Sequence, residues 1–258
     1  MLDPERDSGS RLNGFRSVPE LGTAGLSAVL VVSKDGLVLL DGALPQSVLR
    51  IEANIRALGF RVEDIRWVLN SHAHFDHAGG IAALARDAGA RVGASLEGAK
   101  ALRAGAPPRE DPQAGFGKTM RFAKVARAEG LNDGAQVRAG ELVITAHHTP
   151  GHTPGGTTWT WRSCEGERCV DVVYADRLNP VSAPGFHFSR RGTPPGRIEQ
   201  FQKGIATVSA LPCDVILSVH PDFSETFEKL ARRESGLEAN PFIAALVGRA
   251  SATLEEAT

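Results

Sequence analysis

Histidine and aspartate gather in one short stretch of the chain. Three imidazoles and a carboxylate occupy six residues in the run His72-Ala-His74-Phe-Asp76-His77. Imidazole nitrogen and carboxylate oxygen are ligands that zinc takes in catalytic sites. A single histidine is usually a core or surface residue, but three of them with a carboxylate at this spacing predict a metal site.

Two more histidines follow strand-like segments later in the chain. His152 lies in a turn-rich run from Thr149 to Gly156, which would hold its ring rigidly, and His220 ends an apolar segment. Both histidines therefore fall at the ends of later predicted strands and are candidate site residues. For His147, His148 and His187, a place beside the site and a place on the surface both remain open.

Strand-like and helix-like segments alternate along the whole chain and must position these residues. Period-2 and helical spacing of apolar residues separate the two types. The expected strands are 26–32, 37–40, 65–69, 91–92, 141–146, 157–161, 170–174 and 214–219, and the expected helices are 45–58, 78–87, 198–211, 226–233 and about 241–250. The Pro- and Gly-rich segment 105–118 is expected to be a loop bordering the site. Strands in both halves with helices interspersed predict an α/β fold, in which two β-sheets pack face to face with helices outside.

Composition limits the partners. The 258 residues carry 29 Lys and Arg against 30 Asp and Glu, and a formal charge of -1. Nucleic acid and anionic membranes call for a basic surface, so neither is expected as a partner. No apolar run approaches the ~20 residues that span a bilayer. We expect one domain over residues 1–258, in which residues 1–21 are loosely ordered.

The three cysteines bear on the compartment. Cys164 and Cys169 flank a turn-like stretch between two predicted strands and are either bridged or a pair of reduced thiols. A bridge would favour an oxidising compartment. Cys213 precedes an apolar strand and is expected to be a buried small hydrophobe. The location is therefore expected to be periplasmic if a signal peptide was removed from the chain, and otherwise cytoplasmic.

At these residues the sequence resembles the metallo-β-lactamase superfamily, whose signature is His-x-His-x-Asp-His followed by two more distant histidines. The resemblance covers residues 22–221. Within the superfamily it is most similar to class B β-lactamases of the third subclass, through Thr-Trp-Thr-Trp at 158–161, Tyr-Ala-Asp at 174–176, and Leu-Pro-Cys-Asp at 211–214 running into His220. The resemblance implies the αββα sandwich of two mixed β-sheets with helices on the outer faces.

The resemblance also implies two zinc ions and assigns their ligands residue by residue. The first ion would take His72, His74 and His152, and the second Asp76, His77 and His220. It implies a hydrolase that opens the β-lactam ring of antibiotics, in which a hydroxide held by the metal attacks the lactam carbonyl. Asp76 would also act as a catalytic residue by orienting that nucleophile. The expected partner is thus a small-molecule β-lactam, and the sequence predicts no particular oligomeric state.

The chain departs from the family beside the second ion. Where a serine is usual, it has Arg177, followed by Leu178 and Asn179. We expect Arg177 and Asn179 to bind the substrate in place of hydroxyl side chains. Two other outcomes stay open for Arg177: its charge repels the second zinc, or it turns to solvent or to a carboxylate. Cys213 matches a family cysteine that often pairs with a later one, and no cysteine follows it here, so a free thiol is expected.

Two other functions remain open. Quorum-signal lactonases of the same superfamily share a stretch much like residues 71–80, and in such relatives an aspartate at the place of Asp176 bridges both metals. A lactonase or thioesterase, acting for example on acyl-homoserine lactones, is therefore the alternative enzyme. A non-catalytic zinc-binding module is the third hypothesis, and open coordination positions argue against it.

Overall fold

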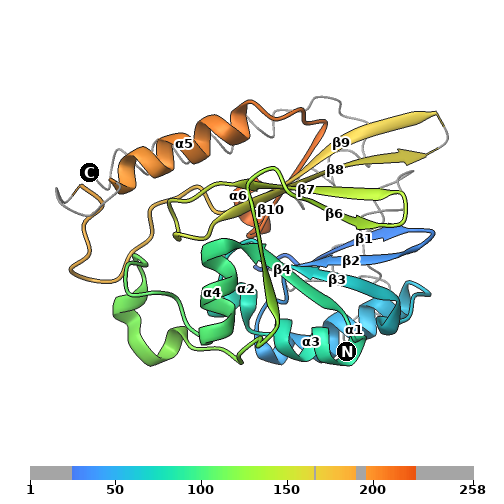
Figure 1. Cartoon of the computed structure of the whole chain (residues 1–258), viewed down its shortest axis with the longest axis horizontal. Coiled ribbons are helices and arrows are strands. Elements are labelled where there is room, and N and C mark those ends of the chain that lie inside the picture. Colours follow the sequence, from blue (N-terminus) through green and yellow to red (C-terminus); the bar gives the residue numbers. More distant parts are fainter. Residues whose placement is uncertain (1–24, 166, 190–195, 225–258) are drawn as a thin grey trace, which may run out of the picture.

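The computed structural model describes residues 25–165, 167–189 and 196–224, and in these residues two β-sheets pack face to face with helices outside them (Figure 1). Each sheet has five strands and contains both parallel and antiparallel pairs. The predicted αββα sandwich is therefore confirmed. The expected single domain over 1–258 stays a prediction, and the segment 1–21 lies outside the described residues.

The first sheet begins with a hairpin and continues as parallel strands. β1 (Val29–Ser33) and β2 (Gly36–Leu40) are antiparallel and are joined by a tight turn. β3 (Ile65–Leu69), β4 (Arg91–Ser95) and β5 (Ala128–Leu131) follow in that order, each parallel to the one before. The carboxyl ends of β2, β3 and β4 therefore meet at one edge of the sheet.

The second sheet has the order β10-β9-β8-β7-β6. Its strands are β6 (Gln136–Ala139), β7 (Leu142–His148), β8 (Thr157–Glu165), β9 (Arg168–Ala175) and β10 (Val215–Ser218). The last two are parallel and the other neighbours are antiparallel. The carboxyl ends of β9 and β10 thus lie side by side, next to the start of β8.

Helices cover the outer faces of both sheets (Figure 1). On the first sheet lie α1 (Val48–Ala57), α3 (Ile81–Ala88) and α4 (Leu96–Ala104), and on the second lies α5 (Arg197–Ser209). Two single-turn helices, α2 (Phe75–Ala78) and α6 (Pro221–Ser224), directly follow strand ends. No helix in the described ranges combines the length and the apolarity that crossing a bilayer requires.

The central strands are buried on both faces, which is why they read as continuous apolar runs. Along β2, Leu37 and Leu39 pack toward the helices, whereas Val38 and Leu40 belong to the core between the sheets. Along β9, Tyr174 points into the same inter-sheet core and Val173 packs toward α5. Alternation of side chains along a strand thus divides the apolar residues into three layers.

Several element boundaries differ from the sequence expectation. The first strand begins at Val29 rather than at residue 26, and the helix expected over 78–87 is divided into α2 and α3. The helix α4 and the strands β5 and β6 were not predicted, and the segment 105–118 runs into a 3₁₀ helix, Ala114–Met120. The expected helices 226–233 and 241–250 lie outside the described residues.

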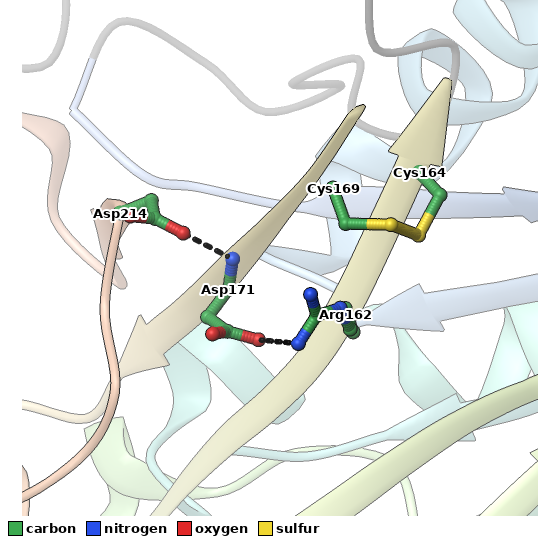
Figure 2. Close-up of a disulfide and its surroundings, with 5 residues drawn as sticks. All are labelled: Arg162, Cys164, Cys169, Asp171 and Asp214. Atoms are coloured by element: carbon green, nitrogen blue, oxygen red, sulfur yellow. Dashed lines mark hydrogen bonds and ion pairs between the residues drawn. A yellow bond between two sulfur atoms is a disulfide. The ribbon is translucent and has the colours of Figure 1, made fainter. Parts of the chain in front are cut away.

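The hairpin of β8 and β9 carries the expected disulfide (Figure 2). Cys164 and Cys169 face each other in the register of the two strands and are bridged. Next to them, Arg162 of β8 lies 3.9 Å from the carboxylate of Asp171 on β9. Cys213 is a free thiol, as expected, but it is half-buried rather than buried, because it lies in the turn before β10.

Candidate metal centre

The histidines collect where strand ends of the two sheets meet. β3 leads into His72 and His74, β10 leads into His220, and the loop between β7 and β8 carries His152. The backbone N–H of Thr157, at the start of β8, donates to the carbonyl of Ser71 at 2.8 Å and so joins the two sheets at this edge. The edge is rigid because nearly every residue around it is buried.

His72, His74 and His152 form a compact group of buried rings. One ligand atom from each lies within 4.8 Å of the others. The ring centroids are 4.8 Å apart for His72 and His74, 5.0 Å for His72 and His152, and 5.1 Å for His74 and His152. Three imidazoles facing one point are the ligand set of a metal site that keeps an open position.

Each ring of this group is held through the nitrogen that faces away from the common point. The hydrogen bonds are His72 Nδ1 to Asp176 Oδ1 at 2.7 Å, His74 Nε2 to Asp111 Oδ1 at 3.0 Å, and His152 Nδ1 to the carbonyl of Asn179 at 3.0 Å. Such partners orient metal-binding histidines and set their tautomers. Of the remaining nitrogens, Nε2 of His152 contacts the amide of Gln113, and Nε2 of His72 is buried with no hydrogen-bond partner among the described residues.

A second group lies beside the first. Asp76 Oδ2 is 3.3 Å from His77 Nε2 and 3.6 Å from His220 Nε2, and the two Nε2 atoms are 3.1 Å apart. His72, Asp76 and His77 also present ligand atoms within 4.8 Å of one another, so the two groups adjoin. The Nδ1 atom of His220 is bonded to the carbonyl of Gly25 at 3.0 Å, which aims its Nε2 at the group.

A buried carboxylate after β2 supports the loop of the second group. Asp41 accepts hydrogen bonds from the N–H and the hydroxyl of Ser71, from the amide of Asn70 and from the hydroxyl of Tyr174, at 2.6–2.9 Å. Its backbone is in the left-handed region, at φ 61°. Asp41 Oδ2 also lies 3.6 Å from His77 Nδ1. A non-glycine residue in this conformation is strained, and these four hydrogen bonds hold it there.

Burial keeps most of these imidazoles neutral, which is the form that binds metal. It lowers the pKa of His72 and of His152 well below the usual value, and positive charge on neighbouring rings adds to the effect. Burial, with the charges of His77 and Arg177, lowers the pKa of His220 to about 3. Because a protonated imidazole cannot bind a cation, these three rings are ready to act as ligands near neutral pH.

His77 and Asp76 behave differently because they form a charge pair. Burial disfavours charge on His77, but the carboxylates of Asp76 and Asp41 outweigh burial and raise its pKa to about 10. Burial likewise disfavours the ionised form of Asp76, yet His77 outweighs it and holds the pKa of Asp76 well below its usual range. A cation that binds here must displace the proton of His77.

Arg177 and Asn179 lie at the rim of the second group and are bonded to each other. The Nε–H of Arg177 donates to Asn179 Oδ1 at 2.6 Å, and its Nη1 lies 3.0 Å from His220 Nε2. The guanidinium carbon is 5.5 Å from the ring centre of Phe223. Arg177 is therefore half-buried, and no carboxylate of the described residues lies within ion-pair distance of it, although the charges of Asp76 and Asp176 attract it. Its guanidinium faces the candidate metal position.

The structure thus brings together all six predicted ligands and the two predicted substrate-binding residues. Of the three histidines left open, His147 bonds to Thr160 Oγ1 on the adjacent strand β8, and His148 bonds to the carbonyl of Leu131 at the end of β5 in the other sheet. His187 is exposed.

Sequence reasoning missed Asp41, Asp111 and Gln113. The last two fall in the loop expected to border the site, and Gln113 Nε2 lies 3.2 Å from His152 Nε2. The signal for Asp41 was its place, directly after a buried strand that runs parallel to β3.

The comparisons with known proteins agree with this geometry. The family model described as "Metallo-beta-lactamase superfamily" matches residues 22–165. A hydroxyacylglutathione hydrolase of Anaeromyxobacter dehalogenans (strain 2CP-C) is 32% identical over 123 residues, which are 48% of this chain and 37% of that protein. The match therefore spans little more than a third of the length of that curated relative.

Two solved structures are similar over nearly the whole chain. The Rm3 metallo-beta-lactamase is 40% identical, with a TM-score of 0.90 over 97% of this chain and 95% of its own. MEM-A1, a subclass B3 metallo-beta-lactamase from a soil metagenome library, is also 40% identical, with a TM-score of 0.89 over 97% of both chains.

Proposed function

The chain belongs to the metallo-beta-lactamase superfamily, and from that premise we propose that it is a zinc-dependent hydrolase that opens the β-lactam ring of antibiotics. The observation that supports this most directly is the pair of adjoining ligand groups, whose free nitrogens and carboxylate oxygen converge at one edge of the sandwich. Similarity to subclass B3 enzymes over 97% of the chain supports the choice of substrate class.

The residues present fit zinc at both positions. All six donors are imidazole nitrogens or a carboxylate oxygen, the ligands that zinc accepts in catalytic sites. The buried Nε2 of His72 has no hydrogen-bond partner, and an unsatisfied polar atom of this kind in a buried site calls for a ligand. We assign His72, His74 and His152 to a first ion and Asp76, His77 and His220 to a second.

When bound, zinc lowers the pKa of a coordinated water to about 7 and polarises a carbonyl oxygen. The side chains of the protein hold the metal-binding rings and orient them. Asp111, Asp176 and the carbonyl of Asn179 fix the three rings of the first group, so their geometry is set before substrate arrives. Asp76 keeps 26% of its side chain exposed, so its carboxylate can also accept a hydrogen bond from the attacking water and orient it.

We propose that Arg177 binds the carboxylate of the substrate. A guanidinium offers two parallel N–H donors to a carboxylate, which a serine hydroxyl cannot do. Asn179 fixes the direction of this guanidinium by accepting its Nε–H. Asn179 thus acts through Arg177, since its side-chain oxygen is already engaged and its backbone carbonyl holds His152.

The lactonase alternative has less support. That hypothesis needs Asp176 to bridge two metals, but Asp176 belongs to neither ligand group and instead contacts the opposite nitrogen of His72. A purely structural zinc module is also disfavoured, because Asp76 and His220 remain partly exposed at the second group. The disulfide supports an oxidising compartment, and we propose the periplasm on that basis.

Steady-state kinetics with three substrates tests the proposal. The zinc-loaded protein is assayed with a cephalosporin, a carbapenem and an acyl-homoserine lactone, with His72→Ala as the inactive reference. We expect hydrolysis of at least one β-lactam and no lactone turnover above that reference. Lactone turnover without β-lactam turnover would establish the alternative instead, and no turnover of any of the three would favour a binding module.

A further inference from the structure

Arg177 occupies a place that bears directly on the second ligand group. It follows β9, and its guanidinium is held by two contacts, to Asn179 Oδ1 at 2.6 Å and to His220 Nε2 at 3.0 Å. The Phe223 ring lies beside it, with 5.5 Å between the guanidinium carbon and the ring centre. The positive charge of Arg177 is therefore held in a defined position by these contacts.

The atom that Arg177 contacts is the one that a metal ion would need. The Nδ1 atom of His220 is bonded to the carbonyl of Gly25, which leaves Nε2 as the nitrogen that faces His77 and Asp76. An N–H donor and a cation cannot share the single lone pair of that nitrogen. Metal binding at His220 therefore requires the guanidinium to withdraw.

We propose that Arg177 is a tethered cation that opposes binding of a metal ion at Asp76, His77 and His220, so that the chain fills its two metal positions unequally. This inference rests on the proposed zinc site but concerns a property beyond the proposed activity. The first group is affected less. Its rings are held by Asp111, Asp176 and a backbone carbonyl, which carry no positive charge. The charge of Arg177 reaches it only through His152, whose Nε2 does not contact the guanidinium.

Charge rather than contact alone makes the effect specific to Arg177. Gln113 also places an amide nitrogen 3.2 Å from a ligand nitrogen, that of His152. An amide is neutral and turns over to present its oxygen, so it gives way to a cation at little cost. A guanidinium keeps its charge in every rotamer and has no acceptor to present.

The size of the effect follows from the distance. If the guanidinium kept its present position, a zinc–nitrogen bond of about 2 Å added to the 3.0 Å contact would place the two cations at most about 5 Å apart. Zinc bound to one carboxylate carries one net positive charge. At an effective dielectric of ~20, this repulsion weakens binding of the second zinc on the order of a hundredfold. Withdrawal of the flexible side chain reduces this toward about tenfold.

Zinc titration of the full-length apoprotein against a chromophoric chelator measures both binding steps. We compare wild type with Arg177→Ser and Arg177→Lys, and with Arg162→Ser as a control that removes an exposed positive charge from β8, away from the site (Figure 2). The expected result is a second step that is about 10–100-fold tighter in Arg177→Ser. The first step should change much less than the second, and Arg177→Lys and Arg162→Ser should behave like wild type.

Two outcomes overturn the inference. Superimposable titrations of wild type and Arg177→Ser would show that the guanidinium does not oppose the second ion. Equal tightening in Arg177→Lys and Arg177→Ser would show that charge is not the cause. Because the titration uses zinc alone and no substrate, its result is independent of whether the zinc-loaded enzyme hydrolyses a β-lactam, and the two proposals fail separately.

Discussion

Replacing Asp176 tests how the fold prepares the first metal position. Its Oδ1 lies 2.7 Å from His72 Nδ1, and both side chains are almost fully buried, at 0% and 1% exposure. In Asp176→Ala the ring loses this partner, and the contact that remains to the same nitrogen within the described residues is the hydroxyl of Ser71 at 3.3 Å. Loss of such an orienting partner lowers metal affinity by about 10–100-fold. We expect Asp176→Ala to lie near the upper end of that range.

Asp176→Asn separates the hydrogen bond from the charge. Burial raises the pKa of Asp176 well above its usual value, so a zinc bound at His72 is what favours its ionised form. The amide keeps an oxygen for the His72 N–H but cannot ionise, and a charge-assisted hydrogen bond is roughly twice as strong as a neutral one. We therefore expect about a tenfold loss of affinity for the first zinc, the lower end of the range for an orienting partner. Asp171→Asn, on the exposed part of the same strand, is the matched control.

Zinc affinity is measured by competition with a chelator, and thermal unfolding of each apoprotein checks the fold. A gradation from wild type through Asn to Ala in the first binding step supports the reasoning. If Asp176→Ala were folded and bound its first zinc as tightly as wild type, the claim that this carboxylate positions His72 would be refuted. A loss of equal size in Asp171→Asn would refute it as well.

Three further predictions concern the metal, the disulfide and the free thiol. Chelation should abolish hydrolysis and added zinc should restore it; full activity after exhaustive dialysis against a chelator would contradict this dependence on metal. The variant His152→Ala should lose several orders of magnitude in turnover even with zinc present. Denatured, unreduced protein should show one alkylatable thiol by intact mass, and three reactive thiols would exclude the bridge. The double variant Cys164→Ser with Cys169→Ser should lower the free energy of unfolding by about 2 kcal/mol, since the closed loop is short. Burial raises the pKa of Cys213 to about 12, so alkylation at pH 8 should be slow until the protein unfolds. The thiol ionises more readily in the unfolded chain. This group should therefore contribute stability below pH 9.0 that is lost as the pH rises to about 12. Denaturant titrations of wild type and Cys213→Ala across this pH range measure that loss.

Features that depend on neighbours in the chain were readable from the sequence. The run from His72 to His77 places its side chains together because six consecutive residues at a strand end cannot lie far apart. The partners Cys164 and Cys169 are five positions apart across a hairpin, so their register follows from the turn. The buried strands β2, β3 and β9 could be predicted because their sequences are mostly apolar, which is typical of strands covered on both faces.

Short strands with weak patterning could not be predicted, because a local pattern needs several residues to be recognised. β5 and β6 have four residues each. β6 alternates exposed with buried positions over too short a length to stand out, and β5 has one buried residue and a glycine. The start of α4 carried a readable signal, since Ser95 caps it by accepting from the N–H of Gly98, but the helix has only nine residues of modest apolar periodicity. Such elements are stabilised mainly by the sheet against which they pack.

Only the tertiary structure decided which distant groups contact the predicted ligands. Asp176 reaches His72 across 104 positions, Asp111 reaches His74 across 37, and Arg177 reaches His220 across 43. These contacts depend on strand register and on the path of each loop, and a slip of one residue would turn every side chain of a strand to the other face. The run from His72 to His77 in the candidate metal centre is therefore legible in the sequence because it is local, whereas the surroundings of all six predicted ligands are set by how the two sheets are brought together.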